Sequence, residues 1–342
     1  MAQRSTLSPS EGDLLSRLLQ SKPISWSAKT PLQRVMLPLF EAHNVELYIK
    51  REDLIDSRLS GNKLYKLYGH LQRAQQLEAK GLASFGGYHS NHLHALAYAG
   101  AALGLNTKAR IRGFQPNQLS PTLIDCQQQG MELEFGSRRS FTDLKQQCLE
   151  ASEAATLDDR GYYWIPEGGG ALEGSQGCRA IIAGIHRQAD KLSLSDYKLC
   201  VPSGTGTTAA GLLSGLSEGD ELYVYSALKL GQKAEAYKAE IEAQSGAHGR
   251  QLTLFDETDF GGFAKTKPEL FHFMERFTAS TGILLDPIYT AKMFYRIERQ
   301  VGEGVWSSGD KIVAIHTGGL QGRRGFPQLM NNDTLVSTAM NK

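Results

Sequence analysis

The sequence predicts an α/β protein with mostly parallel sheets, divided into two domains. Its 342 residues exceed the roughly 100–200 residues of an ordinary domain, so two domains, or one large α/β body with an insertion, are expected. Short β-type runs alternate along the chain with segments of helix length, which is the pattern of β-α-β units. Hydrophobic residues make up 41% of the chain, a fraction that argues against disorder.

The elements follow one another in a regular order. Residues 1 to about 28 carry apolar residues at helical spacing (Leu14, Leu15, Leu18 and Leu19) and predict a peripheral helix. The predicted strands are Val45–Lys50, Leu82–Phe85, Lys108–Ile111, Met131–Phe135, Tyr162–Ile165, Leu199–Val201, Leu222–Ser226, Leu252–Phe255 and Ile312–Ile315. Arg323, Arg324 and the tail to Lys342 are expected to form a solvated end of the chain.

Composition excludes several classes of partner. The chain has 37 Lys and Arg against 36 Asp and Glu, so a net charge of +1 gives no reason to expect nucleic acid. No apolar run approaches the roughly 18–20 residues that span a bilayer, and no apolar segment follows the N-terminal Arg4 as in a secretory signal. The four cysteines form no C-x-x-C pair, which predicts reduced thiols in the cytoplasm.

A loop rich in glycine and threonine, residues 203–208, joins a predicted buried strand to a predicted helix. Its glycines let the backbone approach an anion, and the helix N-terminus and hydroxyls supply donors, so it predicts a phosphate cradle. No lysine follows as in a P-loop. Gly204-x-Gly206-x-x-Ala209 fits a loose dinucleotide pattern, but the next strand ends on Ser226 rather than an acid, which disfavours a nicotinamide cofactor. An ordinary strand-to-helix turn is the alternative.

A lysine opens another predicted helix. Gly61 and Asn62 form a turn, and Lys63 begins a helix whose apolar face holds Leu64, Leu67 and Leu71. The positive field at a helix N-terminus favours the neutral amine, which is the form that makes Schiff bases. The alternative is a surface lysine that tolerates its position.

A third junction follows the glycine pair Gly86-Gly87. Ser90 or Asn91 is a natural N-cap for the helix after it, and the same helix mouth could bind a ligand. His89, His92 and His94 suggest a metal, but no acid or thiol nearby in the sequence completes a site, so none is expected.

Together these motifs resemble fold type II pyridoxal-phosphate enzymes, the tryptophan synthase β-subunit group. Within that group the chain is similar to the 1-aminocyclopropane-1-carboxylate deaminase / D-cysteine desulfhydrase branch. The shared stretches, in the same order, are 50–54 with 61–63, 86–91, 204–208, 285–289 and 316–320. The resemblance runs from about Pro31 to Gly319. It implies two open α/β domains, with residues 1–65 and 176–342 forming the large cofactor-binding domain and 66–175 the small one, and it suggests a homodimer.

The resemblance also implies roles for individual residues. Lys63 would form a Schiff base with the aldehyde of pyridoxal 5'-phosphate, Asn91 would hydrogen-bond its phenolate oxygen and Thr317 would face its pyridine nitrogen. The residues expected to hold the phosphate are Gly204, Thr205, Gly206, Thr207 and Thr208, with Lys66 as a further candidate. The residues expected to contact the substrate are Ser90, Asn91, His92 and Tyr289. Lys63, Ser90 and Tyr289 are the candidate catalytic residues, and each is a candidate for the base that removes the α-proton.

Positions that separate the two activities of the branch favour a desulfhydrase. Where the deaminases carry Glu, Leu and Gln, this chain has Thr290, Thr317 and His92. A hydroxyl stabilises a protonated pyridine ring less than a carboxylate does, which suffices when a good leaving group such as thiolate departs. We therefore expect a lyase that converts a small amino acid to a 2-keto acid and ammonia. The alternatives are 1-aminocyclopropane-1-carboxylate deaminase, a hydrolase, or a cofactor-binding homologue with a different or no substrate.

Overall fold

The computed structural model describes residues 9–329, apart from residues 60, 154–156, 248 and 257–258, and the strands of this part of the chain form two sheets. The six-stranded sheet has the order β1-β2-β10-β7-β8-β9, and only β1 runs antiparallel to its neighbour. Its strands are β1 (Leu32–Val35), β2 (Glu46–Arg51), β7 (Tyr197–Ser203), β8 (Glu221–Ser226), β9 (Gln251–Asp256) and β10 (Lys311–His316). The four-stranded sheet is parallel throughout, in the order β5-β4-β3-β6. Its strands are β3 (Gly81–Gly86), β4 (Asn106–Arg112), β5 (Glu132–Gly136) and β6 (Tyr162–Ile165).

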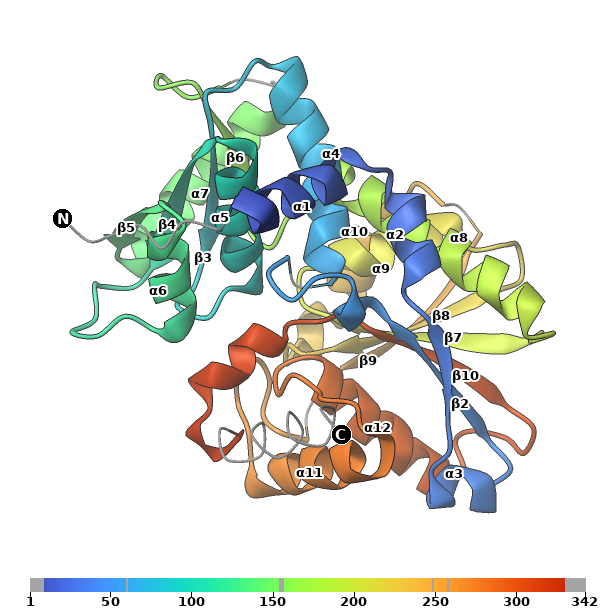
Figure 1. The fold of residues 1–342 in the computed structure, drawn as a ribbon. Coiled ribbons are helices and arrows are strands. Elements are labelled where there is room, and N and C mark those ends of the chain that lie inside the picture. Colours follow the sequence, from blue (N-terminus) through green and yellow to red (C-terminus); the bar gives the residue numbers. More distant parts are fainter. Residues whose placement is uncertain (1–8, 60, 154–156, 248, 257–258, 330–342) are drawn as a thin grey trace.

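Helices cover both faces of the larger sheet, as Figure 1 shows. The helices are α1 (Pro9–Gln20), α2 (Pro23–Lys29), α3 (Pro38–Ala42), α4 (Asn62–Gln76), α5 (Asn91–Leu103), α6 (Pro121–Gln128), α7 (Arg138–Glu153), α8 (Ala171–Lys191), α9 (Thr207–Gly215), α10 (Ala234–Ser245), α11 (Pro268–Thr281) and α12 (Thr290–Gly302). Short 3-10 turns are η1 (Glu52–Leu54), η2 (Gly231–Lys233) and η3 (Leu320–Gly325). Within β7, Leu199 and Val201 pack toward α8, α9 and α10, whereas Cys200 packs toward α11 and α12. The predicted α/β class with mostly parallel sheets is confirmed, and none of the described helices is both long and apolar enough to cross a membrane.

Each predicted strand overlaps an observed one, but β1 was not predicted. It is a four-residue edge strand with only its two end residues, Leu32 and Val35, buried, so its sequence shows no apolar run. The predicted N-terminal helix is also wrong in part, because the chain breaks at Ser21 and Lys22 and restarts as α2 with Pro23 at its first turn. This second helix is not peripheral, since Trp26 is completely buried.

Helix α8 links the two sheets, because it follows β6 of the smaller sheet and precedes β7 of the larger one. It packs so closely on its neighbours that side chains are excluded. A Cβ atom on Gly177 would lie 1.9 Å from the carbonyl oxygen of Tyr65 in α4, and one on Gly184 would lie 1.8 Å from Oγ of Ser27 in α2. Glycine at these two positions therefore lets α4 and α2 pack directly against α8. The predicted domain boundaries at residues 66 and 175 fall inside these two helices, and the boundaries stay a prediction.

The predicted solvated end is wrong for Arg323 and Arg324. Arg323 is 4% exposed and its Nη1 donates to the carbonyl oxygen of Leu285, while Arg324 forms an ion pair with Asp125 of α6. Both residues belong to η3, which packs against α6, and a pair of arginines in a sequence does not reveal such distant partners. The rest of the predicted tail, residues 330–342, lies outside the described residues.

Candidate active site

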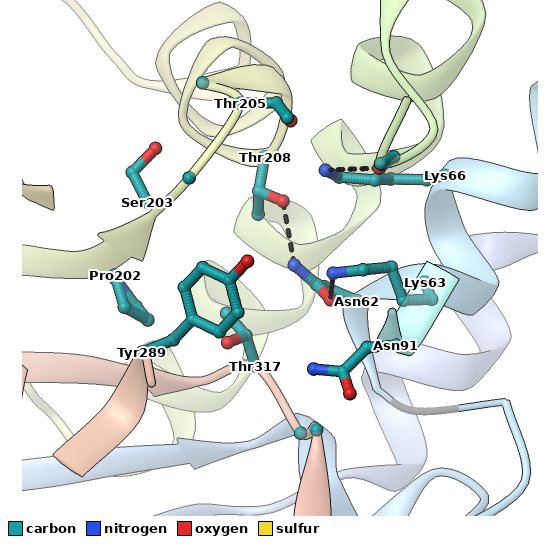
Figure 2. A pocket seen from close by; sticks show the side chains of 15 residues that line it. Asn62, Lys63, Lys66, Asn91, Pro202, Ser203, Thr205, Thr208, Tyr289 and Thr317 are labelled. Atoms are coloured by element: carbon teal, nitrogen blue, oxygen red, sulfur yellow. Dashed lines mark hydrogen bonds between the residues drawn. The ribbon is translucent and has the colours of Figure 1, made fainter. Parts of the chain in front are cut away.

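A cavity opens where β7 and β10 end and α4, α5 and α9 begin (Figure 2). It is lined by Asn62, Lys63, Lys66, Asn91, Gly168, Pro202, Ser203, Gly204, Thr205, Gly206, Thr208, Tyr289, Thr317, Gly318 and Gly319. The structure thus brings together most of the residues singled out in the sequence. Of the residues expected to hold the cofactor or contact the substrate, Ser90, His92 and Thr207 do not line this cavity.

The first residues of α4 are fixed against the end of β10. The backbone nitrogen of Asn62 donates to the carbonyl oxygen of Thr317 over 3.1 Å. Gly61 has a φ of +56°, and a Cβ there would lie 2.5 Å from the same oxygen, so this approach requires glycine. The result is that Lys63, in the first turn of α4, extends into the cavity.

The amine of Lys63 is held by its neighbour in the sequence. Lys63 Nζ donates to Asn62 Oδ1 over 2.9 Å, and Asn62 Nδ2 donates to Thr208 Oγ1 over 2.9 Å, as Figure 2 shows. Asn62 thereby connects the amine to the threonine-rich loop. This bridge was not predicted, because the sequence suggested only a turn at Asn62 and its partner Thr208 is 146 residues away.

Burial and a second lysine make Lys63 an unusual amine. Burial, followed by the positive charge of Lys66, lowers the pKa of Lys63 to about 7. Lys66 donates to the carbonyl oxygen of Gly168 over 3.0 Å, and burial lowers the pKa of Lys66 to about 8. A large fraction of Lys63 is therefore neutral near pH 7, and a neutral amine can attack a carbonyl carbon. The sequence had suggested this neutral form from the helix N-terminus alone.

The glycine-threonine loop forms a concave wall of the cavity. It leaves β7 at Ser203 and enters α9 at Thr207, with Gly206 in the left-handed region at a φ of +79°. A Cβ on Gly204 would lie 3.0 Å from the ring of Tyr289. The first N–H groups of α9 have no acceptor within their helix, and the hydroxyls of Thr205 and Thr208 lie beside them. This arrangement can bind an anion, as the sequence predicted.

Asn91 reaches the cavity from the start of α5, which follows β3 of the four-stranded sheet, whereas its sequence neighbours do not. Ser90 is the N-cap of α5, as predicted, and its Oγ accepts a hydrogen bond from the backbone of Leu93 over 3.2 Å. His92 is buried behind the cavity with Nε2 3.0 Å from Ser84 Oγ. The structure therefore gives no support to a substrate contact by His92, because adjacent positions on a helix face different directions.

Tyr289 stands opposite Lys63 and lies just before α12. The carboxylate of Asp286 accepts hydrogen bonds from the backbone nitrogens of residues 288, 289 and 290, at 2.8–3.0 Å, and so fixes the turn. The Tyr289 ring packs edge-on against Phe263, with centroids 5.9 Å apart. Burial and the charge of Asp286 raise the pKa of the Tyr289 phenol. Its hydroxyl is therefore protonated at neutral pH and can donate a hydrogen bond.

Thr317 occupies the remaining wall, directly after β10. His316 before it is completely buried, with Nε2 2.7 Å from the carbonyl oxygen of Leu284, and its Nδ1 accepts from the backbone nitrogen of Gly318 over 3.2 Å. These bonds orient the turn that presents the Thr317 hydroxyl to the cavity. Among the described residues that line the cavity, none is Asp or Glu, so the uncharged hydroxyl of Thr317 stands there without a neighbouring carboxylate in the wall.

The histidines after Gly87 do not gather around a metal. His94 Nε2 lies 3.1 Å from the carboxylate of Asp125, an acid too distant in the sequence to be expected there. Across the described residues, no group of three or more His, Cys, Asp or Glu side chains is placed to hold a metal ion. The His94–Asp125 contact is instead part of the packing of α5 on α6.

Comparison with known proteins identifies a family that matches most of the chain. The family model described as "Pyridoxal-phosphate dependent enzyme" matches residues 26–318. The bifunctional D-cysteine desulfhydrase/1-aminocyclopropane-1-carboxylate deaminase of Arabidopsis thaliana is 28% identical, covering 94% of this chain and 88% of its own length. A putative 1-aminocyclopropane-1-carboxylate deaminase of Pyrococcus furiosus is 27% identical, with 92% and 96% covered. A crystal structure of an ACC deaminase homologue superposes with a TM-score of 0.72 at 27% identity, covering 97% of this chain and 99% of its own.

Proposed function

The chain belongs to the pyridoxal-phosphate-dependent enzymes, and from this premise we propose that it eliminates the β-substituent of a small amino acid, as a D-cysteine desulfhydrase does. The products would be a 2-keto acid, ammonia and the released substituent. The observation that supports this reaction is Thr317 in a cavity wall that, over the described residues, contains no carboxylate. A hydroxyl leaves the cofactor ring a weaker electron acceptor, which favours substrates with a good leaving group.

The residues of the cavity fit pyridoxal phosphate. A Cβ on Gly204 would lie 3.0 Å from Tyr289, which lines the cavity, so glycine there leaves open the side of the loop that an anion would approach. Unpaired N–H groups at the start of α9 and the hydroxyls of Thr205 and Thr208 supply donors for a phosphate. Across the cavity stands Lys63 with its lowered pKa, which suits an amine that must bind an aldehyde.

When bound, the cofactor supplies an aldehyde that condenses with amines and a ring that accepts an electron pair. The phosphate would be held by the loop at residues 204–208 with help from Lys66, and Asn91 would donate to the phenolate oxygen. Lys63 would hold the aldehyde carbon until substrate arrives, and its freed Nζ would then accept the α-proton. Tyr289, protonated at neutral pH, would donate a hydrogen bond to the departing substituent and stabilise the negative charge that develops there. Ser90 stays a proposed substrate contact next to Asn91, and in this structure its hydroxyl caps α5.

A substrate panel tests the proposal. Purified protein loaded with pyridoxal phosphate is mixed with D-cysteine, L-cysteine or 1-aminocyclopropane-1-carboxylate, and keto acid and sulfide are measured. We expect equal amounts of sulfide and keto acid from D-cysteine and none from Lys63→Ala. Keto acid from the cyclopropane substrate alone would identify a deaminase instead. Loaded protein that acts on none of the three would contradict the proposed elimination.

Three further expectations remain proposals. We propose a cytoplasmic location, supported by Cys126, Cys148, Cys178 and Cys200, which are all unpaired thiols. We propose a homodimer on the family resemblance alone, and light scattering of the purified protein tests it. We also propose that the large and small domains divide near residues 66 and 175, which limited proteolysis of the stripped protein would locate.

A further inference from the structure

A hydrogen bond across the cavity mouth joins the two domains at Asn91. Gln321 Nε2 donates to Asn91 Oδ1 over 2.5 Å, although the two residues are 230 positions apart. Asn91 is the first residue of α5 in the smaller domain, and Gln321 belongs to η3, which follows β10 of the larger sheet. Because the bond involves the oxygen of the Asn91 amide, it bears on which end of that amide faces the cavity.

The turn that carries Gln321 is anchored to two different parts of the molecule. Arg323 donates to the carbonyl oxygen of Leu285, and Arg324 forms its ion pair with Asp125. The Gln321 side chain therefore starts from a backbone that is tied to both domains. Because this backbone is held in place, the Gln321 side chain can fix the position of the Asn91 oxygen.

The nitrogen end of the Asn91 amide points toward the interior of the cavity, on the side of Thr317 and Tyr289, and the oxygen end points away (Figure 2). Gly319 makes room for this orientation, since a Cβ there would lie 2.7 Å from Asn91 Nδ2. Gly319 also has a φ of +88°, which disfavours any other residue. Among the described residues no acceptor is recorded for the N–H donors of Asn91, so they are available to a ligand in the cavity.

The nitrogen of the Gln321 amide makes this hydrogen bond, whereas its oxygen accepts none from the described residues. Oε1 of Gln321 is buried and has no hydrogen-bond partner among the described residues. Turning both amides around would keep one bond between them but would leave a buried N–H of Gln321 unpaired instead, and unpaired buried N–H groups are rarer in proteins than unpaired carbonyl oxygens. The reversed pair would also present the Asn91 carbonyl oxygen to the cavity.

We propose that Gln321 is a positioning residue that holds the Asn91 amide with its N–H donors toward the phenolate oxygen of pyridoxal phosphate. This inference rests on the proposed placement of Asn91 at that oxygen. The orientation of the amide matters because an N–H group attracts an anionic oxygen, whereas a carbonyl oxygen in the same place repels it. Gln321 therefore determines whether the Asn91 amide attracts or repels the phenolate oxygen, although Gln321 does not line the cavity itself.

The variant Gln321→Glu tests the proposal, because it keeps the shape of the side chain and removes its donors. The glutamate can only accept, so Asn91 would turn its nitrogen to residue 321 and its oxygen to the cavity. We expect the dissociation constant of pyridoxal phosphate, measured by fluorescence quenching of the cofactor-stripped protein, to rise about tenfold or more. Gln128→Glu adds the same charge at an exposed position of α6 and should leave the constant unchanged.

A cofactor analogue without the ring oxygen, 3-deoxypyridoxal 5'-phosphate, separates positioning from a general structural effect. Gln321→Glu should bind this analogue as the unaltered protein does. Equal weakening of cofactor and analogue, or no weakening of either, would overturn the role of Gln321.

Asn91→Ala shows which of the two proposals fails. If Asn91→Ala weakens the cofactor but not the analogue while Gln321→Glu changes neither, Gln321 has no positioning role and Asn91 keeps its own. If Asn91→Ala also leaves the preference for cofactor over analogue unchanged, Asn91 does not face the phenolate oxygen, and the inference fails with that placement.

Discussion

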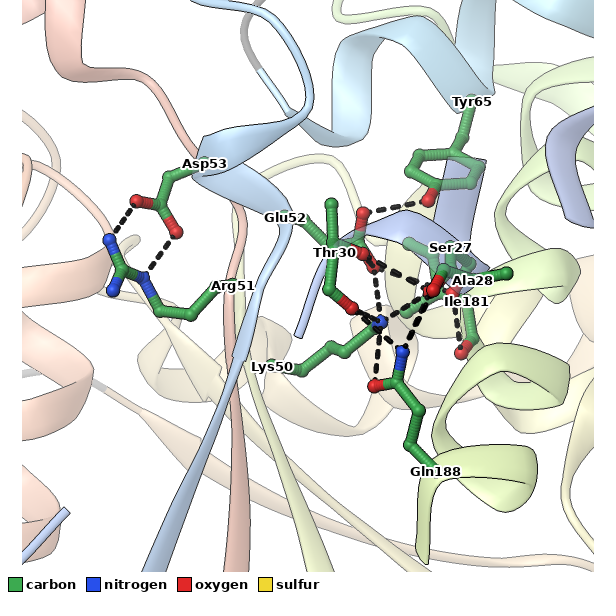
Figure 3. Close-up of polar contacts among 10 residues, drawn as sticks. All are labelled: Ser27, Ala28, Thr30, Lys50, Arg51, Glu52, Asp53, Tyr65, Ile181 and Gln188. Atoms are coloured by element: carbon green, nitrogen blue, oxygen red, sulfur yellow. Dashed lines mark hydrogen bonds and ion pairs between the residues drawn. The ribbon is translucent and has the colours of Figure 1, made fainter. Parts of the chain in front are cut away.

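The hydroxyl of Tyr65 donates a 2.7 Å hydrogen bond to Oε2 of Glu52, and both side chains are completely buried. The other carboxylate oxygen of Glu52 accepts from Thr30 over 2.9 Å and lies 3.5 Å from Nζ of Lys50 (Figure 3). Lys50 in turn donates to Ser27 in α2 and to Gln188 in α8. Since Tyr65 follows Lys63 by one helical half-turn, this network ties the helix that carries the reactive amine to β2, η1, α2 and α8.

Removing Glu52 from this network should destabilise the protein strongly. Burial raises the pKa of Glu52 and lowers the pKa of Lys50, and each charge is retained by the other. Glu52→Gln leaves Lys50 buried without its counter-charge, so we expect the free energy of unfolding in urea to fall by about 3–5 kcal/mol. Tyr65→Phe removes one hydrogen bond and should cost about 1–3 kcal/mol. Arg17→Ala, which breaks an exposed pair with Asp13, is the control and should barely change stability. A Glu52→Gln effect as small as that of the control would show that the network does not stabilise the fold.

The close contact between α4 and α8 predicts that even a methyl group is not tolerated at Gly177. Gly177→Ala would place a Cβ 1.9 Å from the Tyr65 carbonyl oxygen, and neither backbone can move without disturbing a packed helix. We expect a loss of about 3 kcal/mol or more in the free energy of unfolding. Gly302→Ala is a matched control at the end of α12, where the nearest atom to the new Cβ would be 3.9 Å away, and it should be neutral or slightly stabilising. Similar unfolding midpoints for the two variants would contradict the close approach.

The sequence predicts the strands of this fold well because most of them are buried on both faces. Leu199, Cys200 and Val201 all lie in the core, so β7 reads as a continuous apolar run whichever face is considered. The edge strand β1 lacks that property and escaped prediction. Residues within one loop, such as Gly204, Thr205, Gly206 and Thr208, could also be assigned to the site, because their neighbours in space are their neighbours in sequence.

The parts of the site that could not be predicted depend on contacts between distant segments. Asn62 meets Thr208 across 146 residues, Gln321 meets Asn91 across 230, and Arg324 meets Asp125 across 199. Local motifs also cannot tell which way a side chain turns. Ser90 and His92 flank Asn91 in the same motif, yet only Asn91 reaches the cavity, because the start of α5 rotates successive side chains away from one another.

Tyr289→Phe should separate hydrogen bonding to the departing substituent from cofactor binding. The raised pKa of Tyr289 keeps its hydroxyl protonated, and phenylalanine preserves the ring that packs on Phe263. We expect kcat for D-cysteine to fall about 100-fold or more, with the affinity for pyridoxal phosphate unchanged. Unaltered kcat would show that Tyr289 does not assist the departing substituent, and the assay is steady-state release of sulfide.

The lowered pKa of Lys63 should respond to its charged neighbour. Lys66→Met removes a positive charge that lowers the pKa of Lys63, so that pKa should rise from about 7 toward its ordinary value of 10.5 while burial still holds it below that value. The measurement is the pH dependence of acetylation at Lys63 in cofactor-stripped protein, followed by mass spectrometry of the peptide. Lys80→Met, an exposed change beyond the end of α4, should leave the titration where it was. An unchanged pKa in Lys66→Met would mean that burial alone sets it.

The same two lysines should make the stability of the cofactor-stripped protein depend on pH. In the folded chain Lys63 and Lys66 release their protons at about pH 7 and about pH 8, whereas in the unfolded chain both amines keep them up to about 10.5. Between about pH 7 and 10.5 the unfolded state therefore binds more protons, and the free energy of unfolding must rise with pH across this window. Below about pH 7 both lysines are protonated in the folded and in the unfolded chain. The free energy of unfolding is then lowered by the whole cost of burying the two charged amines.

The double variant Lys63→Met/Lys66→Met isolates this contribution from other titrating groups. Urea unfolding at several pH values between 6.5 and 9.5 should show the variant gaining stability over the unaltered protein at the acid end, with the difference shrinking as pH rises. The direction follows from the sign of both shifts: a lysine that is deprotonated by folding opposes folding most where protons are plentiful. A difference that is constant over this range would mean that Lys63 and Lys66 titrate alike in the folded and unfolded chains, and the neutral amine inferred at Lys63 would then be wrong.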